Sequence, residues 1–108
     1  MTRRLVLAPE EAERWQRDTR YQAALGARLA PDASWQTRGS CTGVDPMTFF
    51  PEEPAGADVA LGLCNRCTVR GHCLAAALTT AEPEGVWGAT TPDERRRMRA
   101  VWTDRWRA

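Results

Sequence analysis

Four cysteines in a chain of 108 residues constrain the possible folds more than any other feature of this sequence. Two residues lie between Cys64 and Cys67, five lie between Cys67 and Cys73, and twenty-two lie between Cys41 and Cys64. A separation of two residues lets one turn direct both sulfurs at the same point, so four thiolates spaced in this way can bind one metal centre. The unequal spacings differ from the paired C-x-x-C motifs of a zinc ribbon. The pattern therefore favours a metal centre or metal cluster, with zinc as a weaker alternative.

Two other interpretations of the cysteines remain open at this point. Four cysteines allow three disulfide pairings, and Cys64-x-x-Cys67 has the spacing found in thiol–disulfide exchangers. The first seven residues lack the apolar run of a signal peptide, and no stretch of the sequence could span a bilayer. We therefore expect a cytoplasmic protein with no membrane partner. Thiols stay reduced in that compartment, which favours bound metal over disulfides.

The composition points to a thin hydrophobic core. The chain has two Phe, one Tyr and no Ile, and its mean hydropathy is −0.52. Such a small chain gains stability from a metal that ties its segments together. All basic residues are arginines, six of them within residues 95–107 against one acid, while residues 45–58 carry four acids and no base. The overall net charge of +1 indicates no class of partner.

The sequence predicts an all-α fold in three parts. Residues 1–33 form an N-terminal extension with one accessory helix over residues 10–30, in which Trp15, Thr19, Leu25 and Leu29 are the candidates for a buried face. Residues 34–90 form the cysteine-bearing domain, with one helix over 57–63 that carries Val59, Ala60 and Leu63 on one face, and a second over 69–80. Residues 91–108 form a short basic C-terminal helix.

The C-terminal helix has clear start signals and an apolar stripe. Thr91 can cap it, Pro92 suits its first position, and Glu94 stands three residues after the cap. Asp93 and Arg97 are four residues apart and can pair. The apolar stripe consists of Met98, Val101, Trp102 and Trp106. Three arginines cluster on a flank away from the stripe, either as a solvated face or as phosphate contacts: Arg96, Arg99 and Arg107.

Aromatic residues surround the cysteines in the sequence. Phe49 and Phe50 are adjacent and cannot both face inward on one regular element, so we expect one to pack inside and the other to face a partner. Glycines on both sides of Val86-Trp87 permit a tight turn with Trp87 at its tip. Trp35 either covers the metal site or faces a partner. His72 lies beside Cys73 and is expected at the surface, because four cysteines already complete a ligand set.

Taken in order, these motifs resemble the WhiB-like family of actinobacteria. The resemblance covers about residues 35–99 and rests on Cys41, Asp45-Pro46, Phe49-Phe50-Pro51, Cys64-x-x-Cys67, Cys73-Leu74 and Gly85-Val86-Trp87-Gly88, followed by arginines. The family implies a small helical domain of short helices organised around a [4Fe–4S] cluster. Its four ligands would be Cys41, Cys64, Cys67 and Cys73.

The resemblance also implies a non-enzymatic regulator of transcription that binds region 4, the C-terminal domain of the primary sigma factor. Many members sense redox change or nitric oxide through the cluster, and several bind DNA through a basic C-terminal segment. The aromatic residues that match the sigma contact are Trp35, Phe49, Phe50 and Trp87. On this view Arg96, Arg99 and Arg107 would contact promoter DNA weakly, and mainly within the sigma complex.

Three features depart from the family pattern. Thr68 stands where a proline commonly follows the second cysteine of the pair, and Ala89 stands where a second glycine commonly closes the turn after Trp87. The sequence ends at Ala108, which leaves little room for a long basic tail. The alternatives are a protein disulfide reductase that uses Cys64 and Cys67 in the cluster-free form, and a zinc-stapled interaction module.

Overall fold

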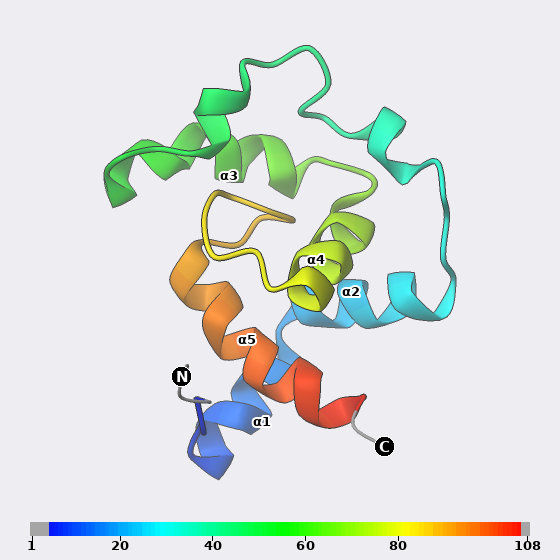
Figure 1. Cartoon of the computed structure of the whole chain (residues 1–108), viewed down its shortest axis with the longest axis vertical. Coiled ribbons are helices and arrows are strands. Elements are labelled where there is room, and N and C mark those ends of the chain that lie inside the picture. The colour runs from blue at the N-terminus through cyan, green and yellow to red at the C-terminus, as the bar shows by residue number, and fades with distance from the viewer. Residues whose placement is uncertain (1–4, 107–108) are drawn as a thin grey trace.

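The computed structural model of the chain describes residues 5–106, and every regular element in that range is helical (Figure 1). The elements are α1 (Pro9–Arg17), α2 (Thr19–Leu29), the short 3₁₀ helices η1 (Trp35–Arg38), η2 (Pro46–Phe49) and η3 (Pro54–Ala57), then α3 (Asp58–Asn65), α4 (Arg70–Thr80) and α5 (Pro92–Arg105). The predicted all-α fold is confirmed. No helix in the described range is both long enough and apolar enough to cross a membrane.

The N-terminal extension contains two helices, so the expected single helix over residues 10–30 is wrong. The break falls at Asp18, whose backbone is extended (φ −61°, ψ 131°). Its carboxylate accepts a 2.8 Å hydrogen bond from the backbone N–H of Arg20 and so caps α2. Aspartate favours such cap positions because its short side chain competes with the backbone for hydrogen bonds. The segment around Asp18 is rich in Ala and Arg, which favour helix, so the sequence pattern does not indicate this break.

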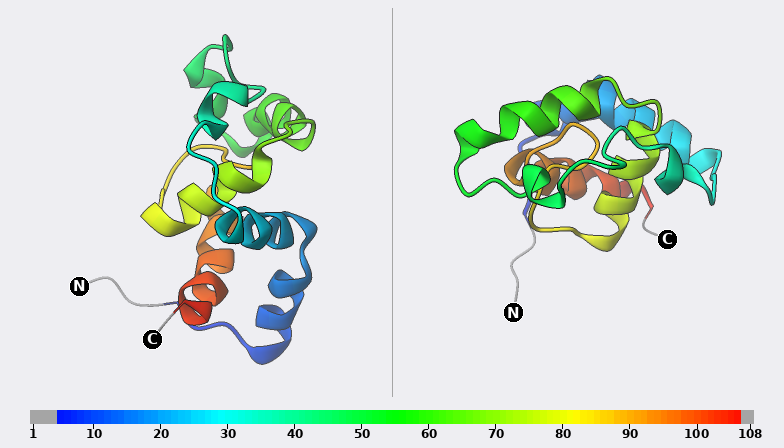
Figure 2. Two further views of the ribbon diagram at one scale, coloured as in Figure 1. Left: turned by 90° about the vertical axis from the view of Figure 1, so that its right-hand side faces the viewer. Right: turned by 90° about the horizontal axis from the view of Figure 1, so that it is seen from above.

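The extension is part of the main core and is not an accessory. Helix α2 crosses and packs against α4 (Figures 1 and 2), and the two backbones approach closely at Gly71, where a Cβ would lie 2.6 Å from the carbonyl oxygen of Ala23. The expected buried face of this segment is also wrong in part. Thr19 is exposed and Leu29 is 69% exposed, whereas α2 buries Tyr21 and two alanines. Small residues suit such a close helix contact but produce a weak hydrophobic pattern.

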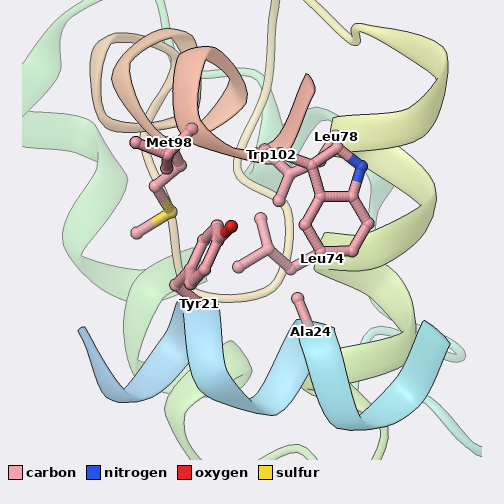
Figure 3. Close-up of a cluster of buried hydrophobic side chains, with 7 residues drawn as sticks. Tyr21, Ala24, Leu74, Leu78, Met98 and Trp102 are labelled. Carbon is pink, nitrogen blue, oxygen red and sulfur yellow. The ribbon is translucent and has the colours of Figure 1, made fainter. Parts of the chain in front are cut away.

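The main core lies where α2, α4 and α5 meet (Figure 3). Tyr21 packs edge-on against Trp102, with ring centroids 6.0 Å apart and an interplanar angle of 87°. The core residues are Tyr21, Ala24, Leu74, Leu78, Met98, Val101 and Trp102, and Trp106 packs against them. The predicted apolar stripe of the last helix is therefore confirmed.

Helix α5 begins as its sequence predicts. Thr91 and Glu94 form a reciprocal capping box, and Pro92 occupies the first turn. Asp93 and Arg97 pair at 3.3 Å. Arg97 also pairs with Glu11 of α1 at 3.0 Å, so the extension is fastened to α5 by charge as well as by apolar contact.

A second, smaller core lies around α3, at the opposite end of the molecule from α1 (Figure 2, left). Its buried residues are Phe49, Ala57, Ala60, Cys64, Val86 and Ala89. Helix α3 turns its Ala60 and Cys64 face inward, one helical turn apart. The expectation that Val59 shares a face with Ala60 is wrong, because Val59 is 66% exposed whereas Ala60 is fully buried. It precedes Ala60 by one residue and so points about 100° away.

Candidate metal centre

All four cysteines line one pocket of about 310 Å³. Cys41 lies in the loop after η1, Cys64 near the end of α3, Cys67 in the turn between α3 and α4, and Cys73 in the first turns of α4. Residues far apart in the sequence therefore bring their sulfurs to the same cavity. This is the arrangement that the cysteine spacing predicts.

Local hydrogen bonds position the cysteines. The backbone N–H of Cys67 donates to the carbonyl of Cys64 at 3.0 Å, which closes the turn at the end of α3. The backbone N–H of Cys73 donates to the carbonyl of Val69 at 3.0 Å, at the start of α4. The loop that carries Cys41 reaches this turn through the backbone N–H of Ser40, which donates to the Cys67 sulfur at 3.4 Å.

The environments of Cys64 and Cys73 oppose ionisation of these two thiols when no cation is present. Burial raises the pKa of Cys64, and the negative charges of Cys67 and Cys41 raise it further. Burial also raises the pKa of Cys73 to about 12, and the other three thiolates add to that effect. Each thiolate thus raises the free energy needed to ionise a further thiol in the pocket. Four ionised sulfurs in this pocket require a bound cation to balance them.

The turn between α4 and α5 supplies hydrogen-bond donors to the sulfurs. The backbone N–H groups of Gly88 and Ala89 lower the pKa of Cys64, and that of Gly88 also lowers the pKa of Cys73, against the dominant effect of burial. Gly85 (φ 83°) and Gly88 (φ 55°) adopt left-handed backbone conformations, as their positions around Val86-Trp87 predict. Sequence reasoning did not find these two donors, because they belong to the backbone.

Glycine is required at position 88 for a second reason. A Cβ there would lie 2.6 Å from the Cβ of Leu74 and 2.7 Å from the carbonyl oxygen of Arg70. The turn can pack against α4 only because this position has no side chain. The neighbouring Ala89 is buried and keeps the left-handed conformation (φ 65°) that a glycine would adopt more easily.

Four aromatic side chains predicted for the site also line the pocket: Trp35, Phe49, Phe50 and Trp87. Phe49 is 9% exposed and Phe50 is 42% exposed, which confirms that one ring faces inward and the other outward. The Phe50 ring rests on Gly85, where a Cβ would lie 2.7 Å from its nearest carbon. Trp35 and Trp87 are half-buried, and the Trp87 indole N–H donates to the carbonyl of Glu84 at 3.1 Å.

The charged residues named from the sequence fall outside the pocket. Arg96 and Arg99 are exposed on α5, and Arg107 lies outside the described residues. The Nε2 atom of His72 lies 3.3 Å from the carbonyl oxygen of Ala30, the residue just after α2, and His72 does not line the four-cysteine pocket, as expected for a histidine that is not a ligand.

The donor set, four thiols around one cavity, fits a metal centre with thiolate ligands. Within residues 5–106 no three Cys, His, Asp or Glu side chains are close enough together to hold a single ion. A tetrahedral zinc ion needs sulfurs about 2.3 Å from the metal, which would draw all four thiols together. Four thiols spread around one cavity match the needs of a multinuclear cluster, whose irons each take one thiolate.

A small helical chain with four thiols around one pocket, closed by a glycine-containing turn, has the features of a cysteine-liganded metal protein. The family model described as transcription factor WhiB matches residues 35–98, which include all four cysteines. The chain therefore belongs to the WhiB family.

Relatives within this family have been named as regulators. The chain is 40% identical over 74 residues to transcriptional regulator WhiB2 of Mycolicibacterium smegmatis, which covers 66% of this chain and 57% of that protein. It is 40% identical over 68 residues to transcriptional regulator WhiB of Streptomyces coelicolor, covering 63% and 78%, respectively. It is 45% identical over 71 residues to transcriptional regulator WhiD of S. coelicolor, covering 59% and 63%. The chain thus spans little more than half the length of the first of these relatives.

Proposed function

We propose that this protein is a transcriptional regulator that holds a [4Fe–4S] cluster on Cys41, Cys64, Cys67 and Cys73 and binds region 4 of the primary sigma factor. One observation carries the proposal: the four cysteines line a single pocket that is also lined by four aromatic residues. Membership of the WhiB family supports it, because the named relatives are transcriptional regulators. Such a regulator would act in the bacterial cytoplasm.

The cluster would supply the positive charge that four thiolates in this pocket require. It would also join three chain segments, so its binding free energy would be partly folding free energy. Cys41 is the exposed member of the set. Oxygen or nitric oxide would therefore reach the cluster most directly on the Cys41 side, which suits a sensor whose cluster is altered by either molecule.

The proposed sigma contact is the aromatic wall of the pocket. Phe50 and the neighbouring Met47, 66% exposed, present apolar surface to solvent on η2 and just after it. Trp35 and Trp87 are only partly covered. Phe49 has a different part in this proposal: it is buried in the smaller core and supports Phe50 from within. Aromatic side chains at the centre of an interface commonly dominate binding.

DNA contact would be a secondary contribution from α5. Arg96 and Arg99 are exposed, and Arg96 forms a weak ion pair with Asp93 at 4.0 Å. Arg97 is engaged by Glu11 and is not proposed as a phosphate contact. A few arginine–phosphate contacts give weak binding that does not depend on DNA sequence, so promoter choice would come mainly from the bound sigma factor.

The sigma proposal is tested by measuring the affinity of anaerobically purified protein for sigma region 4, before and after cluster removal. We expect the cluster-bound protein to bind and the cluster-free protein to bind much more weakly. Phe50→Ala should weaken binding by about 2 kcal/mol or more while iron content stays unchanged. The matched control is Phe49→Ala, which should instead lower the stability of the protein by roughly 3 kcal/mol, because it leaves a cavity.

Two outcomes would contradict this proposal. If the cluster-bound protein does not bind sigma region 4, the partner is wrong. If metal-free protein catalyses repeated disulfide reduction and Cys64→Ser abolishes that turnover, the chain is a disulfide reductase that uses Cys64 and Cys67.

A further inference from the structure

Arg95 is a buried cation without a partner anion. Its side chain lies in the first turns of α5 and is 2% exposed. None of the ion pairs among residues 5–106 involves it. Burial removes the hydration of a guanidinium, so without an ion pair other groups must compensate for the lost water. Burial of Arg95 therefore carries a desolvation penalty that other interactions in the fold must offset.

The guanidinium is held entirely by neutral oxygens of the loop between α4 and α5. Its Nε and Nη2 donate to the carbonyl of Glu82 at 3.2 Å each, and Nη2 donates to the carbonyl of Glu84 at 2.9 Å. Its Nη1 donates to the carbonyl of Thr90 at 3.1 Å and to the Thr90 hydroxyl at 3.3 Å. One side chain thus joins both ends of the loop. This fork of five donors is a property that lysine does not share.

The loop fixed by Arg95 is the wall of the four-cysteine pocket. Val86, Trp87 and Gly88 line that pocket, and the backbone N–H groups of Gly88 and Ala89 act on the cysteine thiols by lowering their pKa. The charge of Arg95 also acts on the pocket directly. Burial lowers the pKa of Arg95, and a Cys73 thiolate is the largest influence that raises it, ahead of Glu82 and Glu94. Among the negative groups around this cation, Cys73 of the pocket therefore has the largest influence.

We propose that Arg95 is a positioning residue for the metal centre, with two functions. Its buried positive charge balances the negative charge of the cluster and its thiolates, and its hydrogen bonds fix the loop whose amides face the sulfurs. The inference rests on the proposed [4Fe–4S] cluster. Four thiolates carry more negative charge than the cluster core carries positive charge, so the assembled site is anionic. Net charge and hydrogen bonds to sulfur are two of the properties that set a cluster's reduction potential.

Two substitutions separate the charge from the hydrogen bonds. Arg95→Met keeps an apolar stem but removes the charge, whereas Arg95→Lys keeps the charge but cannot bond to Glu82, Glu84 and Thr90 together. Arg105→Met is the matched control, because it removes the same charge from an exposed position further along α5. The measurements on anaerobically purified protein are iron and sulfide content, the midpoint potential of the cluster, and amide hydrogen exchange in the loop from Glu82 to Thr90.

We expect Arg95→Met to shift the midpoint potential to more negative values, since the reduced cluster carries one more negative charge that is no longer balanced. It should also lose its cluster several-fold faster in air. Arg95→Lys should keep a potential near that of the unaltered protein while its loop amides exchange faster. Arg105→Met should change neither property. If Arg95→Met takes up no cluster at all, a cluster of normal potential in Arg95→Lys still supports the proposal.

The proposal is overturned if Arg95→Met has the potential of the unaltered protein. It is also overturned if Arg95→Lys shifts as far as Arg95→Met or takes up no cluster, because a positive charge at this position would then not suffice. An unaltered protein that takes up no cluster would overturn the proposed function and this inference with it. If the protein binds a cluster whose midpoint potential does not change when Arg95 is replaced, this inference alone is overturned.

Discussion

At the scale of single residues, the packing of the turn after Trp87 requires glycine at position 88 but accommodates the methyl group of alanine at position 89. Gly88 and Ala89 both adopt left-handed backbone conformations, with φ of 55° and 65°. Such a conformation costs an L-residue roughly 1–2 kcal/mol. Ala89 recovers part of that cost by burying its methyl group in the smaller core, worth about 0.8 kcal/mol. Gly88 has no room for a methyl group.

We therefore predict opposite tolerance at these two neighbouring positions. Ala89→Gly should change the free energy of unfolding by less than about 1 kcal/mol, because relief of backbone strain offsets the lost methyl group and the added chain entropy. Gly88→Ala should destabilise by about 2 kcal/mol or more and reduce iron content, because the new Cβ would meet Leu74 and Arg70. Chemical denaturation and iron analysis check both. A Gly88→Ala protein with normal iron content would contradict the close packing at the turn.

At the scale of elements, the helices with strong start signals and wide apolar stripes were predictable. The capping box at Thr91 and the stripe on α5 are both confirmed. Arg95 was missed because a charged residue is not expected in a core, although it stands three residues before Met98 and so shares its face. The break at Asp18 was missed because a single aspartate can equally lie on the surface of a continuous helix.

The side chains of the candidate site could be predicted from the sequence, but its backbone donors could not. The cysteines could be predicted because chain spacing alone limits where thiolates can meet. The division between Phe49 and Phe50 followed from their adjacency, although only the structure identifies which ring is buried. The sulfur-facing amides of Gly88 and Ala89 could not be predicted, because every residue type except proline offers the same N–H group.

Helix α5 also carries the prediction for DNA. The double variant Arg96→Ala, Arg99→Ala should lower the affinity of the sigma complex for promoter DNA. The dependence of log affinity on log salt should become shallower by about 0.9 for each phosphate that the variant no longer touches. The control is Arg97→Ala, whose guanidinium is already paired with Glu11 and should leave the slope unchanged. Titrations at several salt concentrations measure the slope. An unchanged slope in the double variant would mean that these arginines do not touch phosphate.

At the scale of the whole molecule, the chain has two cores of different character. The main core joins α2, α4 and α5 through large apolar side chains and ordinary helix packing (Figure 3). The smaller core lies beside the cysteine pocket and contains only one aromatic side chain, that of Phe49. We therefore expect the metal centre to stabilise mainly the part of the molecule around α3. The N-terminal helices, which precede the family match at residue 35, complete the main core.

A single cluster held by four cysteines underlies everything proposed for this protein, and the mass of the intact protein under non-denaturing, anaerobic conditions tests it most directly. The predicted result is the mass of the chain plus four irons and four sulfides, with the brown colour of the protein disappearing together with that added mass. Cys73→Ser should lack the added mass, because one iron would have no thiolate ligand. A chain that carries a single zinc ion, or that keeps four reactive thiols and no metal after anaerobic purification, would contradict the four-cysteine cluster.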